Sequence, residues 1–309
     1  MPANVRPSLR QLECAVAVAD QKSFRGAAAQ LGLSQPALSA HVAQLERDLG
    51  VQVFERDRRR VLVTPAGDAV IAQARNALSA ADGVVEIARG AAEPLAGPLR
   101  IGVIPTVAPY LLPRALPTVR ARFPRLRPAL REDQTVRVMR QLDDGTLDCA
   151  IVALPVAGDV TAATLYREEF VLAVPRDAPL ASRKRARETD LDGETVLLLE
   201  DGHCLRDQAL SVCGGHGAVE ETAFQATSLP TLVQMVASGM GVTLLPEMAA
   251  AVLAPRASSG VVTIRFAPPA PGRTIGLVWR TSSARLRELR LLAQTIGAAA
   301  EKHLADIRA

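Results

Sequence analysis

Serine and glycine residues at four positions divide residues 23–50 into two short helices joined by a tight turn. Ser23 can cap the first helix, and Gly32 supplies the backbone freedom with which a helix ends. Ser34 can cap the second helix, which stops at Gly50. A helix, a short turn and a second helix form a helix-turn-helix unit, in which the second helix can enter the major groove of DNA.

A basic hairpin is expected directly after this pair of helices. Apolar residues at 51–54 and 61–64 flank a charged tip, a pattern typical of a β-hairpin wing. Wing arginines can contact DNA phosphates, while small polar side chains at the start of the second helix can approach base edges. The candidate DNA-binding residues are Ser34, Gln35, Pro36, Ser39, Arg56, Arg58, Arg59 and Arg60. The alternative is a set of ordinary packed helices with a solvated charge run.

The middle of the chain predicts a long helix and then a linker. Apolar residues recur at helical spacing from Thr64 to about Ala92, and a helix of this length between two domains is expected to pair with a copy of itself. Residues 93–98 contain two prolines and a glycine, which favours a linker. Short apolar strands then alternate with helices, which predicts βα units and a mostly parallel sheet.

Composition limits the class of protein. With 309 residues, of which 49% are hydrophobic, the chain is long enough for two or three folded units. The formal net charge of +4 permits an anionic partner without requiring one. No apolar run approaches the ~20 residues of a membrane helix and no signal peptide is evident, so a cytoplasmic location is expected. Four cysteines are too few for a disulfide-stapled scaffold, so any disulfide in that reducing compartment should be transient.

One cysteine lies in a pattern that favours redox chemistry. A helix is expected to start near Cys204, and the free N–H groups and the dipole at a helix N-terminus stabilise a thiolate. His203 and Arg206 can assist, and Asp207, on the same helical face, can hold a hydroxyl group or pass a proton. A thiolate of this kind is the form of cysteine that attacks a peroxide.

A second cysteine, Cys213, follows nine residues after Cys204. If residues 204–213 are helical, a rise of ~1.5 Å per residue separates the two Cα atoms by about 13 Å. A disulfide needs them within about 7 Å, so the helix must unwind before the sulfurs can join, and a modified sulfur becomes a backbone rearrangement. The alternative is that both are small buried apolar residues, which is what we expect of Cys14 and Cys149.

Two longer runs carry a family resemblance. Residues 23–56 read SFRGAAAQLGLSQPALSAHVAQLERDLGVQVFER, and residues 197–210 read LLLEDGHCLRDQAL. The first run resembles the DNA-binding domain of LysR-type transcriptional regulators. The second resembles the redox segment of the hydrogen-peroxide-sensing members of that family. Those members are also similar to this chain at residues 97–113, 224–246 and 273–280, so the resemblance spans nearly the whole sequence.

The resemblance implies an α/β protein with three parts. They are an N-terminal winged helix-turn-helix, a long linker helix that forms the dimerisation seam, and a C-terminal effector domain like a periplasmic binding protein, with two α/β subdomains around a cleft. The implied boundaries are 1–64 for the winged helix-turn-helix, 65–95 for the linker helix and hinge, and 96–309 for the effector domain. Within the effector domain, subdomain I would hold 96–168 plus 272–309, and subdomain II would hold 169–271.

The resemblance also implies roles for individual residues. Cys204 would be oxidised to sulfenic acid, and Cys213 would then close a disulfide with it. The peroxide pocket would be formed by Thr106, His203, Asp207 and Thr135. Thr106 can alternatively cap a helix that starts near Ala108.

These features together favour a peroxide-responsive transcription factor. The family implies a homotetramer, built as a dimer of dimers, on double-stranded DNA. RNA polymerase is the expected protein partner and hydrogen peroxide the signal, and we expect no cofactor, no metal and no membrane. One alternative is a regulator of the same fold that answers a small organic anion in the effector cleft. A second is a thiol peroxidase, against which the winged helix argues, because a peroxidase does not need one.

Overall fold

The computed structural model describes residues 6–56, 61–90, 95–213, 219–254 and 260–309 of the chain. The chain forms two compact units. The N-terminal unit holds Met1–Ala92, Asp143–Thr146 and Ser283–Arg285, and the C-terminal unit holds Glu93–Leu142, Leu147–Ser282 and Leu286–Ala309. No helix in the described ranges has both the length and the apolar character needed to cross a membrane.

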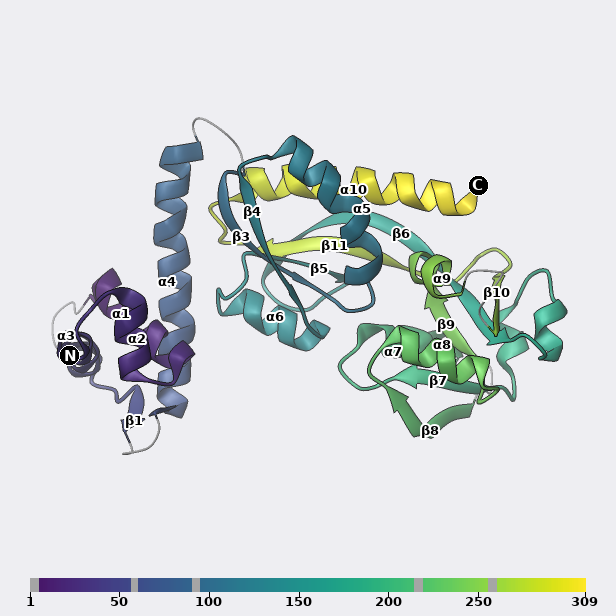
Figure 1. Cartoon of the computed structure of the whole chain (residues 1–309), viewed down its shortest axis with the longest axis horizontal. Helices are drawn as coiled ribbons and strands as arrows, with labels where there is room; N and C mark the ends of the chain where they lie inside the picture. Colours follow the sequence, from purple (N-terminus) through teal and green to yellow (C-terminus); the bar gives the residue numbers. More distant parts are fainter. Residues whose placement is uncertain (1–5, 57–60, 91–94, 214–218, 255–259) are drawn as a thin grey trace. The chain divides into compact units, whose positions relative to one another are not determined.

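Three helices form the core of the N-terminal unit (Figure 1), and they are α1 (Leu9–Gln21), α2 (Phe24–Leu31) and α3 (Gln35–Leu49). The hydroxyl groups of Ser23 and Ser34 each accept a backbone N–H from the helix that follows. The chain leaves α2 and α3 through Gly32 and Gly50, whose φ angles of +64° and +67° are left-handed. The predicted helix-turn-helix, with its caps and its helix ends, is therefore confirmed.

The predicted wing is present as an antiparallel hairpin of β1 (Phe54–Arg56) and β2 (Val61–Val63). Its tip, residues 57–60, lies outside the described residues. The carboxylate of Glu46 on α3 accepts the backbone N–H groups of Val53 and Phe54, at 2.9 and 3.1 Å. This carboxylate fixes the start of the wing to the second helix of the helix-turn-helix.

The predicted long helix is α4 (Pro65–Gly90). Thr64 caps it, because its hydroxyl accepts the backbone N–H of Gly67 at 2.8 Å. α4 packs against α1. Farther along α4, Val84 and Val85 remain exposed, which is the surface expected of a helix that pairs with another chain.

A seven-stranded sheet forms the core of the described part of the C-terminal unit, in the order β10-β6-β11-β5-β3-β4, with β9 also paired to β6. The strands are β3 (Gly97–Val103), β4 (Leu126–Glu132), β5 (Cys149–Leu154), β6 (Val160–Pro175), β9 (Thr243–Pro246), β10 (Val261–Arg265) and β11 (Gly272–Arg280). β3 runs parallel to β4 and β5. The pairs β6–β9, β6–β10, β6–β11 and β5–β11 are antiparallel, so the prediction of a mostly parallel sheet is wrong.

The antiparallel pairs arise because the chain runs along the sheet twice in opposite directions. β6 has 16 residues and β11 has nine. Their pairing extends from Arg280 opposite Val160 to Gly272 opposite Glu169. A succession of βα units would bring every strand in from the same edge of the sheet. A long outgoing strand and its return cannot do so, and no local sequence pattern distinguishes the two cases.

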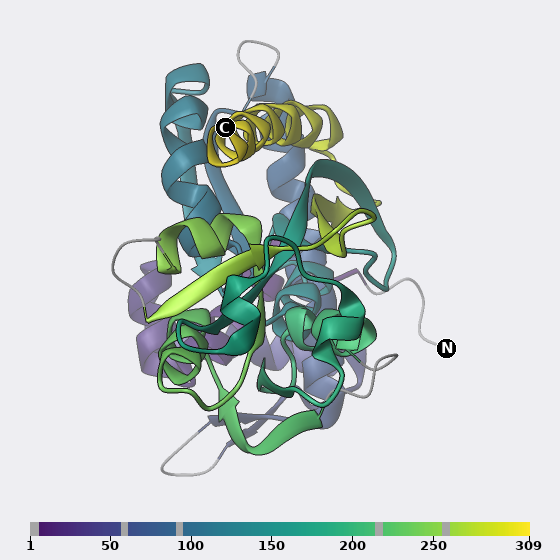
Figure 2. The ribbon, with the colours of Figure 1, turned by 90° about the vertical axis from the view of Figure 1, so that its right-hand side faces the viewer.

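Helices cover this sheet, namely α5 (Ala108–Arg122), α6 (Thr135–Asp143) and α10 (Leu286–Arg308). α10 packs against α5 and β6. Figure 2 looks almost along the axis of α10, drawn in yellow. Its buried residues recur at helical spacing, as Leu289, Leu292 and Ile296 illustrate.

A second, two-stranded sheet carries the cysteine helix. β7 (Thr195–Leu199) pairs in parallel with β8 (Val219–Ala226), and α7 (Cys204–Cys213) lies between them in the chain. α7 starts at the predicted residue. The elements around it are the short helix η2 (Glu188–Leu191), which packs on α7, and α8 (Leu229–Ala237), which packs on β7. α9 (Glu247–Leu253) follows β9 and packs on α8.

Candidate functional site

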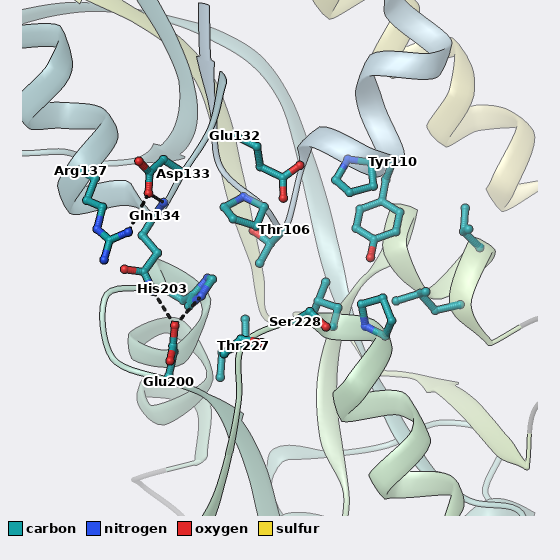
Figure 3. A pocket seen from close by; sticks show the side chains of 17 residues that line it. Thr106, Tyr110, Glu132, Asp133, Gln134, Arg137, Glu200, His203, Thr227 and Ser228 are labelled. Carbon is teal, nitrogen blue, oxygen red and sulfur yellow. Dashed lines mark hydrogen bonds and ion pairs between the residues drawn. The ribbon is translucent and has the colours of Figure 1, made fainter. Parts of the chain in front are cut away.

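A cavity of about 580 Å³ opens in the C-terminal unit where the ends of several elements meet (Figure 3). It is lined by the turn between β3 and α5, the start of α6, the turn between β7 and α7, and the start of α8. Two predicted pocket residues, Thr106 and His203, contribute to its wall. Figure 3 shows Thr106 and Glu132 facing Thr227 and Ser228 across the open space.

Thr106 is held in the wall by a buried arginine. Arg273 donates from Nη1 to the Thr106 hydroxyl at 2.9 Å and from Nη2 to the Thr106 carbonyl at 3.0 Å. The alternative role as a helix cap is wrong, because α5 is preceded by Val107 and has no side-chain cap. Since the hydroxyl oxygen of Thr106 is already an acceptor, its own proton is free to be donated to a ligand.

Arg273 itself is fixed by a buried carboxylate. Its Nε donates to Glu168 Oε1 at 2.9 Å, and both side chains are only 1% exposed. Burial acts to lower the pKa of Arg273, but the negative groups of Glu168, Tyr166 and Cys204 outweigh it and raise that pKa. The guanidinium therefore stays charged, and the thiol of Cys204 lies within reach of its field.

Cys204 is the first residue of α7, half-buried and reduced. The N-terminal turn of a helix offers unpaired N–H groups to a negatively charged group in this position. The same thiol interacts electrostatically with Arg273 on β11. A helix N-terminus and a buried guanidinium both favour the thiolate form of this cysteine.

His203 precedes this cysteine and is almost fully buried. Burial lowers the pKa of His203, although Glu200, whose Oε1 lies 3.9 Å from Nε2, acts in the opposite direction. A lowered pKa leaves the imidazole neutral at pH 7. His203 can therefore exchange hydrogen bonds with a ligand, but it does not supply the positive charge beside Cys204.

The two remaining charged residues of the motif are placed away from the cavity wall. Arg206 is engaged by Asp201 at 2.8 Å and by Glu220 at 2.6 Å. Its charge is thus already paired with two carboxylates, and the expected assistance to Cys204 falls to Arg273 instead. Asp207 is exposed and does not line the cavity, so the structure does not bring it together with Thr106 and His203.

Two buried polar atoms near these residues have no hydrogen-bond partner among the described residues. One is the hydroxyl of Thr135, the first residue of α6, and the other is Oε1 of Gln208, one turn after Cys204. Thr135 is adjacent to the cavity-lining Gln134 but does not line the cavity itself. Leaving a buried polar atom unpaired costs about 1–3 kcal/mol, so each of them is suited to a small hydrogen-bonding ligand.

Cys213 lies at the opposite end of α7 from Cys204 and is buried. Burial, with a smaller contribution from Glu188, raises the pKa of Cys213 to about 11. The thiol is therefore neutral at pH 7 and does not act as a nucleophile where it lies. The helix between the cysteines confirms the predicted separation of about 13 Å between their Cα atoms.

The candidate DNA-reading residues gather at one end of α3. Ser34, Gln35 and Pro36 are exposed in its first turn, and Ser39 follows one turn later, half-buried. Ser34 also caps the helix. The side chains of the wing residues Arg56, Arg58, Arg59 and Arg60 lie outside the described part of the chain.

Comparisons with known proteins place both units. Residues 9–68 match the family model "Bacterial regulatory helix-turn-helix protein, lysR family", and residues 92–301 match "LysR substrate binding domain". The chain belongs to the LysR family of transcriptional regulators. It is 46% identical to the "Probable hydrogen peroxide-inducible genes activator" of Mycobacterium avium, over 94% of both chains. It is 45% identical to "DNA-binding transcriptional dual regulator OxyR" of Escherichia coli (strain K12), over 96% of this chain and 97% of that one.

The fold agrees with that membership. A full-length OxyR variant from Pseudomonas aeruginosa is similar to this LysR-type regulator with a TM-score of 0.80 and 36% identity, over 94% of this chain and 95% of that chain. The predicted family, its peroxide-sensing branch and the predicted fold class are confirmed by these likenesses.

Sequence reasoning missed three residues of the site in this LysR-type regulator. Arg273 and Glu168 come from strands that are distant in sequence and meet only through the pairing of β6 with β11. The available signal was a charged residue at the start of an otherwise apolar strand in each case. Gln208 was detectable more directly, because the spacing of four residues from Cys204 places it on the same helical face.

Proposed function

We propose that this LysR-type regulator senses hydrogen peroxide through Cys204 and converts the signal into a change in how it binds double-stranded DNA. The observation that carries the proposal is the position of Cys204 at the start of α7, within the field of the buried guanidinium of Arg273. Thr106, held by that same guanidinium, lines the adjoining cavity with His203. The names of the relatives, which describe hydrogen peroxide-inducible activators, support the same signal.

The first chemical step forms a sulfenic acid. The thiolate of Cys204 attacks one oxygen of hydrogen peroxide, an S–O bond forms, and the O–O bond breaks. Negative charge develops on the departing oxygen, which leaves as hydroxide and becomes water on taking up a proton. The hydroxyl group of Thr106 donates a hydrogen bond toward that oxygen, and Thr135 and Gln208 assist from the buried side. Asp207 is proposed to exchange the proton with solvent, since it is exposed one turn along α7.

The second step joins the two cysteines. The thiolate of Cys213 attacks the sulfur of the sulfenic acid, an S–S bond forms, and hydroxide leaves to become water. Cys213 must first leave its buried position, because its pKa of about 11 keeps it protonated there. α7 must unwind for the sulfurs to meet, since a disulfide requires Cα atoms within about 7 Å. This coupling of a covalent bond to the loss of a helix is the proposed switch.

The response is proposed to pass through a homotetramer, a dimer of dimers, in the cytoplasm. The exposed Val84 and Val85 on α4 support pairing along the linker helix. We keep the boundaries 1–64, 65–95 and 96–309, with subdomains of 96–168 plus 272–309 and of 169–271, as the units that move. Resetting the spacing of the DNA-binding pairs would alter which half-sites are met and how RNA polymerase is engaged. The protein acts as a regulator and not as a thiol peroxidase.

The test treats the reduced full-length protein with stoichiometric hydrogen peroxide and maps its thiols by peptide mass spectrometry. The expected product is a Cys204–Cys213 disulfide, with Cys14 and Cys149 still reduced. Cys204→Ser should bind DNA but lose the response to peroxide. A normal response of that variant, or four free thiols in the treated native protein, would contradict the proposal.

The charges of the cavity disfavour a small organic anion as the signal. Its wall carries the carboxylates of Glu132, Asp133 and Glu200. The one cation among the described lining residues is Arg137, which pairs with Asp133 at 3.5 Å, while His203 is held neutral by its lowered pKa. An anion would therefore meet a predominantly negative wall. Indifference to peroxide combined with saturable binding of a carboxylic acid would reverse this conclusion.

A further inference from the structure

A line of buried ion pairs leads from the Cys204 site to the last turn of α10. Arg273 is bound to Glu168 Oε1, and the second oxygen of that carboxylate accepts the backbone N–H of Met248 at 3.1 Å. Met248 lies in the first turn of α9. The residue before it, Glu247, is 2% exposed and is the next charged group in the line.

Glu247 is shared by two arginines from distant parts of the chain. Arg265 on β10 donates to its Oε1 at 2.7 Å. Arg308, near the end of α10, donates to its Oε2 from Nη2 at 2.8 Å and from Nε at 3.0 Å. Two arginines on one buried carboxylate fasten the start of α9 to both β10 and α10.

Arg308 also acts on the inner carboxylate through space. Its pKa is raised by the hydrogen bonds to Glu247 and by the nearby charges of Glu169 and Glu168, against a smaller effect of burial. Glu168 is therefore attracted to two guanidinium groups, that of Arg273 by contact and that of Arg308 through the protein interior. In an interior of low dielectric constant such interactions extend beyond the contacting pair.

We propose that Arg308 and Glu247 are positioning residues for the peroxide-reactive thiol, and that they act through Glu168 on the share of the Arg273 charge that reaches Cys204. The inference rests on the proposed function of Cys204. Arg308 draws on the negative charge of Glu168, which leaves more of the Arg273 charge for a thiolate. Glu247 has the opposite effect, because its carboxylate neutralises Arg308.

The other charged groups around α7 stay unchanged in the test of this proposal. They are Glu200, which follows β7, Glu188 on η2, and His203, Arg206 and Asp207 at the start of α7. The two substitutions lie on α9 and α10, outside this group. A change in the reaction of Cys204 can then be assigned to the line of ion pairs.

The experiment compares Arg308→Gln with Glu247→Gln in a Cys213→Ser background of the full-length protein, in which only the first oxidation occurs. The rate of sulfenic acid formation is measured with hydrogen peroxide as a function of pH. Both substitutions break the same ion pair, so a merely structural role would move both rates in the same direction. The proposal instead requires opposite directions, because one substitution removes a positive charge and the other removes a negative charge.

The expected result is a rate about fivefold lower for Arg308→Gln, equivalent to about 1 kcal/mol, with the thiolate titration of Cys204 moved to higher pH. The effect is modest because Arg308 is 43% exposed and therefore partly screened. Glu247→Gln should raise the rate and move the titration to lower pH. Arg290→Gln, an exposed arginine on the same helix, is the matched control and should leave both unchanged.

Two further variants keep the test decisive if Glu247→Gln fails to fold. Arg308→Lys retains the charge and should restore the native rate, and Arg265→Gln should slow the reaction as Arg308→Gln does. An unchanged rate in Arg308→Gln, or a decrease shared by Arg308→Gln and Glu247→Gln, would overturn the proposal. Failure of the proposed function gives a different result, namely no oxidation of Cys204 when only Cys213→Ser is present.

Discussion

Arg273 binds Thr106 twice, through the hydroxyl at 2.9 Å and through the backbone carbonyl at 3.0 Å. The pair joins the return strand β11 to the turn between β3 and α5, and it lies between the cavity and the field of Cys204. One guanidinium thus orients a hydroxyl in the cavity wall and supplies charge to the thiol. This arrangement makes Thr106 the most direct place to test the proposed chemistry.

Replacing Thr106 by valine keeps the volume of the side chain and removes the hydroxyl. The rate of Cys204 oxidation by hydrogen peroxide should fall by about tenfold to a hundredfold, because one hydrogen-bond donor to the departing oxygen is lost. Thr106→Ser, which keeps the hydroxyl, should stay near the native rate. The measurement is stopped-flow oxidation with trapping of the sulfenic acid. Equal rates for the valine and serine variants would remove Thr106 from the reaction.

Glu168→Gln tests the buried ion pair as a source of stability. The amide can still accept hydrogen bonds from Arg273 and Met248, but the buried guanidinium loses its countercharge. The free energy of unfolding should fall by about 3–5 kcal/mol, measured by urea denaturation of the reduced protein. Glu301→Gln, on the exposed side of α10, should change it by less than about 0.5 kcal/mol. A similar small change for Glu168→Gln would show that the pair contributes no net stability.

The local parts of this site could be predicted from sequence, and the long-range parts could not. Caps and helix ends depend on a few neighbouring residues, so Ser34, Gly50 and the start of α7 at Cys204 were all predictable. The direction of β6 and β11 depends on the path of the chain through the whole unit. The pairing of Glu168 with Arg273, 105 positions apart, depends on that path too.

The assignment of charge to the thiol failed for the same reason. Arg206 is the nearest arginine in sequence to Cys204, and it was expected to assist the thiolate. The structure shows it bound to Asp201 and Glu220, whose positions in space the sequence does not reveal. The effective cation, Arg273, comes from another strand. Proximity in sequence identifies candidate charges but not the partners that already neutralise them.

The thiol of Cys213 should be unreactive in the reduced protein at pH 7. A pKa of about 11, two units above its ordinary value, leaves about a hundredfold less thiolate than in a free cysteine. Alkylation by iodoacetamide, followed by mass spectrometry, should therefore be about a hundredfold slower than in the urea-unfolded protein, and it should accelerate as the pH rises toward 11. Alkylation at the same rate in folded and unfolded protein would contradict the burial argument.

His203 should make the reduced protein less stable as the pH falls. Its pKa is lowered in the folded state, mainly by burial, so the unfolded chain binds the proton more readily. The stability linked to the neutral imidazole is present above the ordinary pKa of about 6.5 and is lost as the pH drops through the lowered value. Urea denaturation at pH 7.5 and pH 5 should show a larger loss for the native protein than for His203→Gln. Equal losses would mean that His203 titrates normally.

The DNA interface should separate into positions that supply affinity and positions that supply sequence choice. Arg58→Gln in the wing should weaken binding to all sequences and reduce the slope of log affinity against log salt by about 0.9, because one phosphate contact is lost. Gln35→Ala, in the exposed first turn of α3, should leave that slope unchanged and reduce the preference for the operator over a scrambled duplex. Binding measured at several salt concentrations distinguishes the two, with Arg290→Gln as a control for net charge. An altered slope in Arg290→Gln would attribute the effect to total charge, and equal discrimination by Gln35→Ala would remove that residue from the base-reading set.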